Sequence, residues 1–202
     1  MIRGLSRPAG GYGFSLVELL VAMALGVLLV AAAGTLFVAT RQMSLEQERI
    51  AEMNENLRFA ADFMARDIRA AGLLASGAFD LTHGVEPADP TEDEQEAFTV
   101  RKAGMNCLGD TGPWMASVYS VQGDRLRCGN DATPPQTQPL VSGVLSLKAV
   151  ALNADGDPDW DQPVALRIEL VLKRDAGSQV LTRTLEFVVS LRNAVLHQHQ
   201  SG

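Results

Sequence analysis

The stretch GFSLVELLVAMALGVLLVAAAGTLFVAT, residues 13–40, decides how this chain is organised. It contains one charged side chain, Glu18, and residues 19–40 carry none. A helix of about 20 apolar residues is long enough to cross a bilayer, so the stretch predicts a membrane-spanning helix. A carboxylate inside such a helix costs about 3 kcal/mol on insertion scales, so Glu18 needs a partner or an interfacial position.

Charge and composition set the orientation of the chain. Arg3 and Arg7 precede the apolar stretch, and the long chain after it is acidic, with a net charge of −7 over 202 residues. The positive-inside rule places the first residues in the cytoplasm and the C-terminal domain outside. An acidic surface argues against direct binding of nucleic acid.

A secretory signal peptide is the competing interpretation of the N-terminus. Its apolar region is typically about 7 to 15 residues, whereas this stretch is longer, contains an acid and leads straight into a further helix. The two cysteines, Cys107 and Cys128, fit an oxidising compartment and predict one disulfide, the alternative being two unpaired thiols.

Residues 41–72 predict an amphipathic helix continuous with the apolar one. They contain no proline, and no glycine before Gly72, and their apolar residues recur every three or four positions. These are Ile50, Met53, Leu57, Ala61, Met64, Ile68 and Ala71. Residues 73–97 are acidic and contain prolines, so we expect an exposed connecting loop.

The rest of the chain predicts antiparallel strands. Residues 98–104 and 116–128 are strand-like, and residues 122–124 supply a hairpin turn. Residues 140–152 predict one half-buried strand. Residues 164–174 and 182–193 alternate apolar and polar side chains and flank a short loop at 175–178, so they should pair. The fold class is therefore α+β, a long helix packed on an antiparallel β-sheet head.

The opening motif resembles a known processing signal. Gly13, Phe14, Ser15, Leu16, Val17 and Glu18 follow a short basic leader and resemble the class III signal of type IV prepilins. The resemblance implies that a membrane prepilin peptidase cleaves between Gly13 and Phe14 and N-methylates Phe14. It also implies that Glu18 forms an assembly salt bridge with the amino group of Phe14 in a neighbouring subunit.

Four later segments resemble the minor pilins called PilW: residues 55–72, 119–128, 138–147 and 183–193. This likeness implies a type IV pilin-like subunit that takes part in pilus assembly, priming and tip complex formation. Expected partners are the peptidase and methylase, other minor pilins, the major pilin and a tip adhesin. The expected location is a single pass in the inner membrane with a periplasmic head, then the pilus tip. Pseudopilins of type II secretion share the same N-terminus and are the alternative.

The resemblance and the patterns together predict the domain organisation. The segments are a leader (1–13), an assembly half-helix (14–40), an amphipathic half-helix (41–72), an acidic loop (73–97), a β-sheet head (98–196) and a disordered tail (197–202). No family pattern covers the acidic insert at 85–97, so its role stays open.

Other chemistry is sparsely represented. Residues 153–161 space acidic and amide side chains two apart, so a membrane-tethered calcium-binding module is a further alternative, although the EF-hand pattern does not fit. His83, His197 and His199 are the histidines, and no nucleophile or phosphate-binding motif accompanies them. We therefore expect no enzymatic activity, no catalytic residue, no cofactor and no metal.

Overall fold

The computed structural model describes residues 15–78, 80, 83–89, 91–92, 94–176 and 179–191. The chain divides into two compact units, Met1–Gln47 and Glu48–Gly202. Each is described by itself below. Gly13, Phe14, the leader 1–13 and the tail 197–202 lie outside the described residues.

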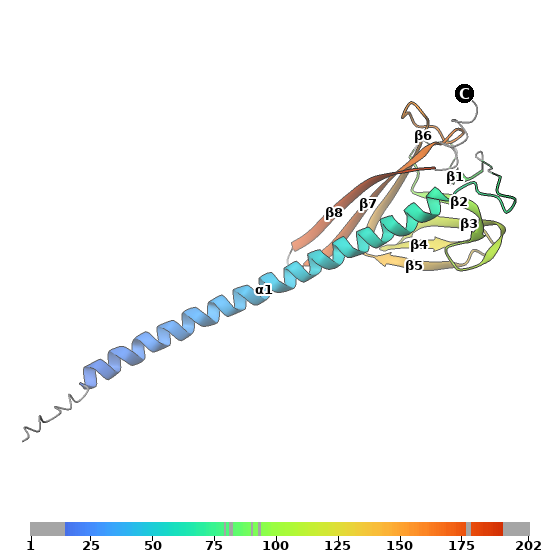
Figure 1. Ribbon diagram of the computed structural model, residues 1–202. Helices are drawn as coiled ribbons and strands as arrows, with labels where there is room; N and C mark the ends of the chain where they lie inside the picture. Colours follow the sequence, from blue (N-terminus) through green and yellow to red (C-terminus); the bar gives the residue numbers. More distant parts are fainter. Residues whose placement is uncertain are drawn as a thin grey trace, which may run out of the picture. The chain divides into compact units, whose positions relative to one another are not determined.

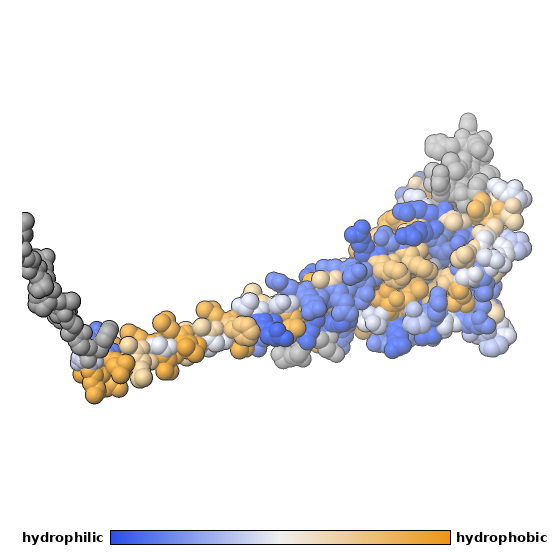
Figure 2. Space-filling model, turned by 60° about the horizontal axis from the view of Figure 1, so that its bottom comes forward, coloured by the Kyte–Doolittle hydropathy of each residue, from blue (hydrophilic) through white to orange (hydrophobic). Residues whose placement is uncertain are grey.

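The first unit is the N-terminal part of helix α1, which spans Leu16–Arg69. From Ser15 to Gln47 every side chain is exposed, and Gly26 is half-exposed. By length and composition, α1 could cross a membrane. Its exposed apolar side chains are the orange surface of this part of the helix in Figure 2.

The second unit begins with the remainder of α1, which supplies one buried stripe to the core. Met53, Leu57, Met64 and Ile68 are buried, as the three-to-four spacing predicts. The helix ends at Arg69, slightly before the predicted end at Gly72. Gly72 adopts φ +78° and donates its N–H to the carbonyl of Arg101 at 2.8 Å, which turns the chain towards the strands.

Five strands form one antiparallel sheet in the order β1-β2-β3-β4-β5 (Figure 1). The predicted hairpin turn at 122–124 joins β3 to β4 and is confirmed. Strand β1 lies inside the segment 73–97, expected to be an exposed connecting loop, so this segment contributes a strand to the sheet. The bounds are Val85–Pro87 (β1), Ala97–Met105 (β2), Thr111–Gln122 (β3), Arg125–Gly129 (β4) and Thr137–Ser142 (β5).

Three further strands form a second sheet in the order β6-β7-β8. They are Val144–Leu152 (β6), Ala165–Ala176 (β7) and Gln179–Ser190 (β8). The single strand predicted over 140–152 is wrong, because Gly143 separates β5 from β6 and the chain passes from one sheet to the other there. Gly143 adopts φ +77°, which a residue with a Cβ rarely takes.

The strands predicted over residues 164–174 and 182–193 are β7 and β8, and they pair antiparallel as expected. Their predicted apolar face points to the core. Leu166, Ile168, Leu170, Leu172, Val189 and Leu191 are buried, and Leu185 and Phe187 pack against them. The α+β class, an apolar N-terminal helix with antiparallel sheets, is therefore confirmed, with two sheets in place of one.

Candidate processing and assembly site

The candidate site begins where α1 begins. Ser15 precedes the helix, and its carbonyl accepts the first intrahelical hydrogen bond, from the N–H of Leu19, at 3.1 Å. Glu18 lies in the first turn. A carboxylate there is favoured by the unpaired N–H groups and the positive end of the helix dipole.

Glu18 is surrounded by exposed apolar side chains. Leu16, Val17 and Leu19 are 75%, 66% and 55% exposed, and the exposed apolar surface continues along the helix. Among the described residues, Glu18 has no ion-pair partner. The site therefore presents one anion on a surface suited to lipid or to other apolar helices.

A disulfide joins Cys107 to Cys128 in the head. Cys107 lies in the turn between β2 and β3, and Cys128 lies in β4, with their Cα atoms 6.2 Å apart. Cys128 is fully buried, and the N–H of Cys107 donates to the buried hydroxyl of Ser117 at 3.1 Å. The bridge fixes the β2–β3 turn to the five-stranded sheet.

A buried polar cluster connects α1 to this sheet and is not predicted by the sequence analysis. Asp67 is 7% exposed; its carboxylate accepts a hydrogen bond from the Tyr119 hydroxyl at 2.7 Å and lies 2.9 Å from Nζ of Lys102. Burial, together with the charge and hydrogen bond of Asp67, raises the pKa of Tyr119 well above its usual value. In the sequence, the one indication that Asp67 is buried is its position next to Ile68, a residue of the predicted apolar stripe.

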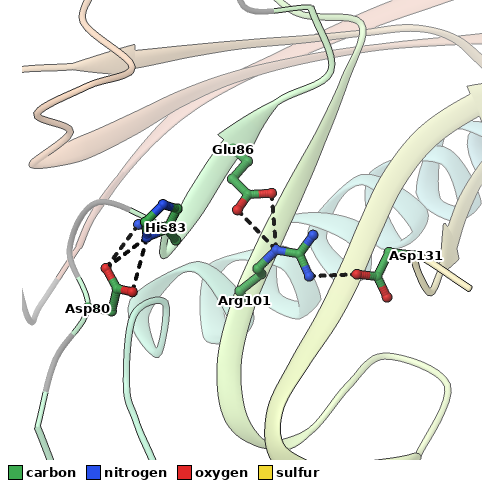
Figure 3. Close-up of polar contacts among 5 residues, drawn as sticks. All are labelled: Asp80, His83, Glu86, Arg101 and Asp131. Atoms are coloured by element: carbon green, nitrogen blue, oxygen red, sulfur yellow. Dashed lines mark hydrogen bonds and ion pairs between the residues drawn. The ribbon is translucent and has the colours of Figure 1, made fainter.

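Arg101 of β2 links β1 to the loop that follows β4, as Figure 3 shows. Its Nε donates to both carboxylate oxygens of Glu86 on β1, at 3.0 and 3.1 Å, and its Nη1 donates to Asp131 at 2.6 Å. The hydrogen bond from Arg101 lowers the pKa of Asp131. In the same view, Nδ1 of His83 lies 3.1 Å from the Asp80 carboxylate.

The acidic insert is anchored to the second sheet at Gln95, in addition to the pairing of β1 with the first sheet. Gln95 is 2% exposed, and its backbone exchanges two hydrogen bonds of 2.8 Å with Ala149 of β6. Its side-chain amide donates to the carbonyl of Asp89 and accepts from the N–H of the same residue. This segment is thus tied to the second sheet.

Residues 153–161, the segment considered for calcium binding, use their side chains for local turns. The Asn153 side chain accepts the N–H groups of Asp155 and Asp157, each at 3.0 Å, and the Asp159 side chain accepts that of Asp161 at 2.8 Å. Within the described part of the chain, no three His, Cys, Asp or Glu side chains are grouped so as to hold a metal ion.

Comparison with known proteins agrees with this geometry. Residues 12–34 match the family model of the prokaryotic N-terminal methylation motif. A relative is the pilin-like protein PilA3 of Thermus thermophilus, 28% identical over 164 residues, which cover 71% of this chain and 68% of the relative.

The motif, the exposed apolar helix and the α+β head together make this chain type IV pilin-like or pseudopilin-like, with a prepilin cleavage motif. The motif implies processing by prepilin peptidase, and the apolar helix is consistent with a membrane or pilus location. Proteins of this kind are structural and not enzymatic.

Proposed function

We propose that this protein is a PilW-type minor pilin that primes type IV pilus assembly and enters the tip complex. The observation that carries the proposal is the position of Glu18, the one anion at the start of an exposed apolar helix and the last residue of the prepilin motif. The four PilW-like segments, which extend from the helix end to β8, support it.

Cleavage between Gly13 and Phe14 removes the basic leader and creates a new amino terminus, which is then methylated. When subunits leave the bilayer and stack helix on helix, that cation and Glu18 of a neighbour neutralise each other. An unpaired charge in such apolar surroundings is costly, so the pair sets the register between neighbouring helices.

The other assignments follow from this one. Residues 14–40 form the membrane and assembly half of the helix, and the head remains in the periplasm before entering the pilus. Partners are then the peptidase and methylase, other minor pilins, the major pilin and an adhesin at the tip. The Cys107–Cys128 bridge suits the oxidising periplasm.

Glu18→Ala tests the proposed pairing. We expect unchanged membrane insertion and cleavage but a large loss of surface pili, counted by electron microscopy. Glu46→Ala is the matched control, because Glu46 is an exposed carboxylate later in the same helix. Normal piliation in the Glu18→Ala strain would overturn the proposed role of this carboxylate.

A minor pseudopilin of type II secretion is the second candidate, since it carries the same N-terminal motif. Deletion of the gene separates the two functions. Loss of pili with intact secretion supports the minor pilin, whereas loss of protein secretion with normal pili supports the pseudopilin.

A further inference from the structure

We propose that the free edge of β8 accepts an extended acidic segment of a partner protein, which adds to the three-stranded sheet as a fourth strand. β8 is the last strand in the order β6-β7-β8, so one of its edges has no neighbouring strand in the described structure. This inference does not depend on the proposed role in pilus assembly.

The hydrogen-bonding pattern identifies which backbone groups point to the free edge. The N–H of Leu191 donates to the carbonyl of Val164, so residue 191 faces β7. The backbone N–H and C=O groups of successive residues point alternately to the two edges of a strand. The β7–β8 register has no shift from one end to the other, so this alternation holds along all of β8. The N–H and C=O groups of the even-numbered residues therefore point away from β7.

These even-numbered residues are accessible. Every one of them from 180 to 190 is exposed, and Val180 and Val188 are 55% and 57% exposed. A long edge strand with unpaired donors and acceptors is a template for another strand. The outward residues are Val180, Thr182, Thr184, Glu186, Val188 and Ser190.

A groove of about 520 Å³ runs between this strand and α1. Its floor is apolar, with Leu57 and Ala65 from the helix and Leu185 and Phe187 from the strand among its lining residues. Both outward and core-facing residues of β8 line it, so the groove opens at the edge where a strand would add. Alternate side chains of an added strand would enter it.

The charges that line the groove indicate which kind of segment binds there. The groove contains Arg58, Arg69 and Arg183 against one acid, Asp62, in a protein whose net charge is −7. Arg58 lies 3.9 Å from Asp62. Within the described part of the chain, Arg69 and Arg183 are exposed and have no hydrogen-bond or ion-pair partner. Cations on both sides of the groove favour an extended segment that carries carboxylates.

The test uses the full-length protein in detergent and a capped peptide of alternating valine and glutamate. We expect saturable binding by fluorescence anisotropy, with slowed amide exchange at the even-numbered residues of β8 and not at the odd-numbered ones. Slowed exchange elsewhere, or no binding at millimolar peptide, would overturn the proposal. So would equal binding of a valine–lysine peptide.

Two pairs of variants separate the contributions. Thr184→Pro removes one outward N–H and leaves the bonds to β7, and we expect it to weaken binding at least tenfold, whereas Thr184→Val binds normally. Arg183→Glu should weaken binding about fivefold or more, whereas Arg125→Glu in the other sheet should have little effect. A native-like circular dichroism spectrum excludes misfolding of the variants.

A truncated protein gives a further test of the edge. Binding that appears only after deletion of residues 192–202 would also overturn the idea of a free edge.

Discussion

Tyr119 is the residue whose hydroxyl most directly connects the helix to the sheet. It is fully buried, stacks on Phe98 with ring centroids 5.2 Å apart, and donates to Asp67. Removal of the hydroxyl leaves one oxygen of a buried carboxylate without its donor. We expect Tyr119→Phe to lower the free energy of unfolding by about 1–3 kcal/mol in urea titrations. A change under a few tenths of a kcal/mol would contradict a structural role for this hydrogen bond.

The same hydroxyl gives a pH dependence with a definite sign. The unfolded chain loses the Tyr119 proton near pH 10, whereas burial raises the pKa of the folded residue. The stabilising contribution is complete below pH 10 and is lost as the pH rises above it, because the unfolded state then binds fewer protons. The difference in stability between wild type and Tyr119→Phe should shrink above pH 10. A difference in stability that stays constant up to pH 12 would contradict a raised pKa of Tyr119.

Asp131 gives a pH dependence of stability at the acid end of the range. The hydrogen bond from Arg101 lowers the pKa of this carboxyl, so its contribution is complete above its usual value near 4 and is lost as the pH falls through the lower folded value. Asp131→Asn should therefore flatten the loss of stability in acid denaturation below pH 4. Asp124→Asn is the control, because Asp124 lies 3.7 Å from Arg125 and is largely exposed. Equal effects of the two variants would argue against a specific Arg101–Asp131 pair.

At the scale of elements, the passage from β5 to β6 depends on Gly143. A Cβ at this position would approach the carbonyl oxygen of Lys173 to 2.9 Å, and the backbone has φ +77°. Gly156 has φ +89° but open space around it. Gly156→Ala should cost about 1–2 kcal/mol from the left-handed conformation alone, and Gly143→Ala should cost more. Equal losses in urea unfolding would show that the contact with β7 is unimportant.

The disulfide constrains the β2–β3 turn against β4. Cys107 and Cys128 are 21 positions apart, and closing a loop of that size stabilises a folded domain by roughly 3 kcal/mol. Replacement of both cysteines by serine should lower the free energy of unfolding by about this amount. A thiol assay on unreduced protein purified from cells should detect no free thiol, and two reactive thiols would refute the bridge in the cell.

Periodicity explains which elements could be predicted. In β7 and β8, alternation and a short loop determine both the strands and their pairing locally. Over residues 140–152 the pattern is apolar on both sides of Gly143, so it does not show that two strands are present. The division into β5 and β6 depends on pairing with other strands, because β5 pairs with β4 and β6 pairs with β7. Asp67 is similar, because its burial depends on Tyr119 and Lys102, which are far away in sequence.

At the scale of the whole molecule, the decisive prediction concerns its N-terminus. Cleavage after Gly13 removes Arg3 and Arg7, so the net charge changes from −7 to −7 − 2 = −9 and the chain shortens to 202 − 13 = 189 residues. Protein purified from membranes of a piliated host should begin at N-methylated Phe14 by sequencing and mass spectrometry. It should also focus at a lower pH than the uncleaved chain.

Two glycine variants make this prediction specific to the motif. Gly13→Leu should leave the leader attached, because we propose that the peptidase cleaves the bond after this glycine. Gly11→Leu introduces the same side chain two residues earlier and should be processed normally. Uncleaved Gly13→Leu protein stays anchored with its basic leader in the cytoplasm, so it should accumulate in the inner membrane and be absent from sheared pili. If wild-type protein keeps its leader, or is cut beyond Ala33, Phe14 is not a free amino terminus. Glu18 must then have another partner, and the proposed pairing between neighbouring subunits fails with it.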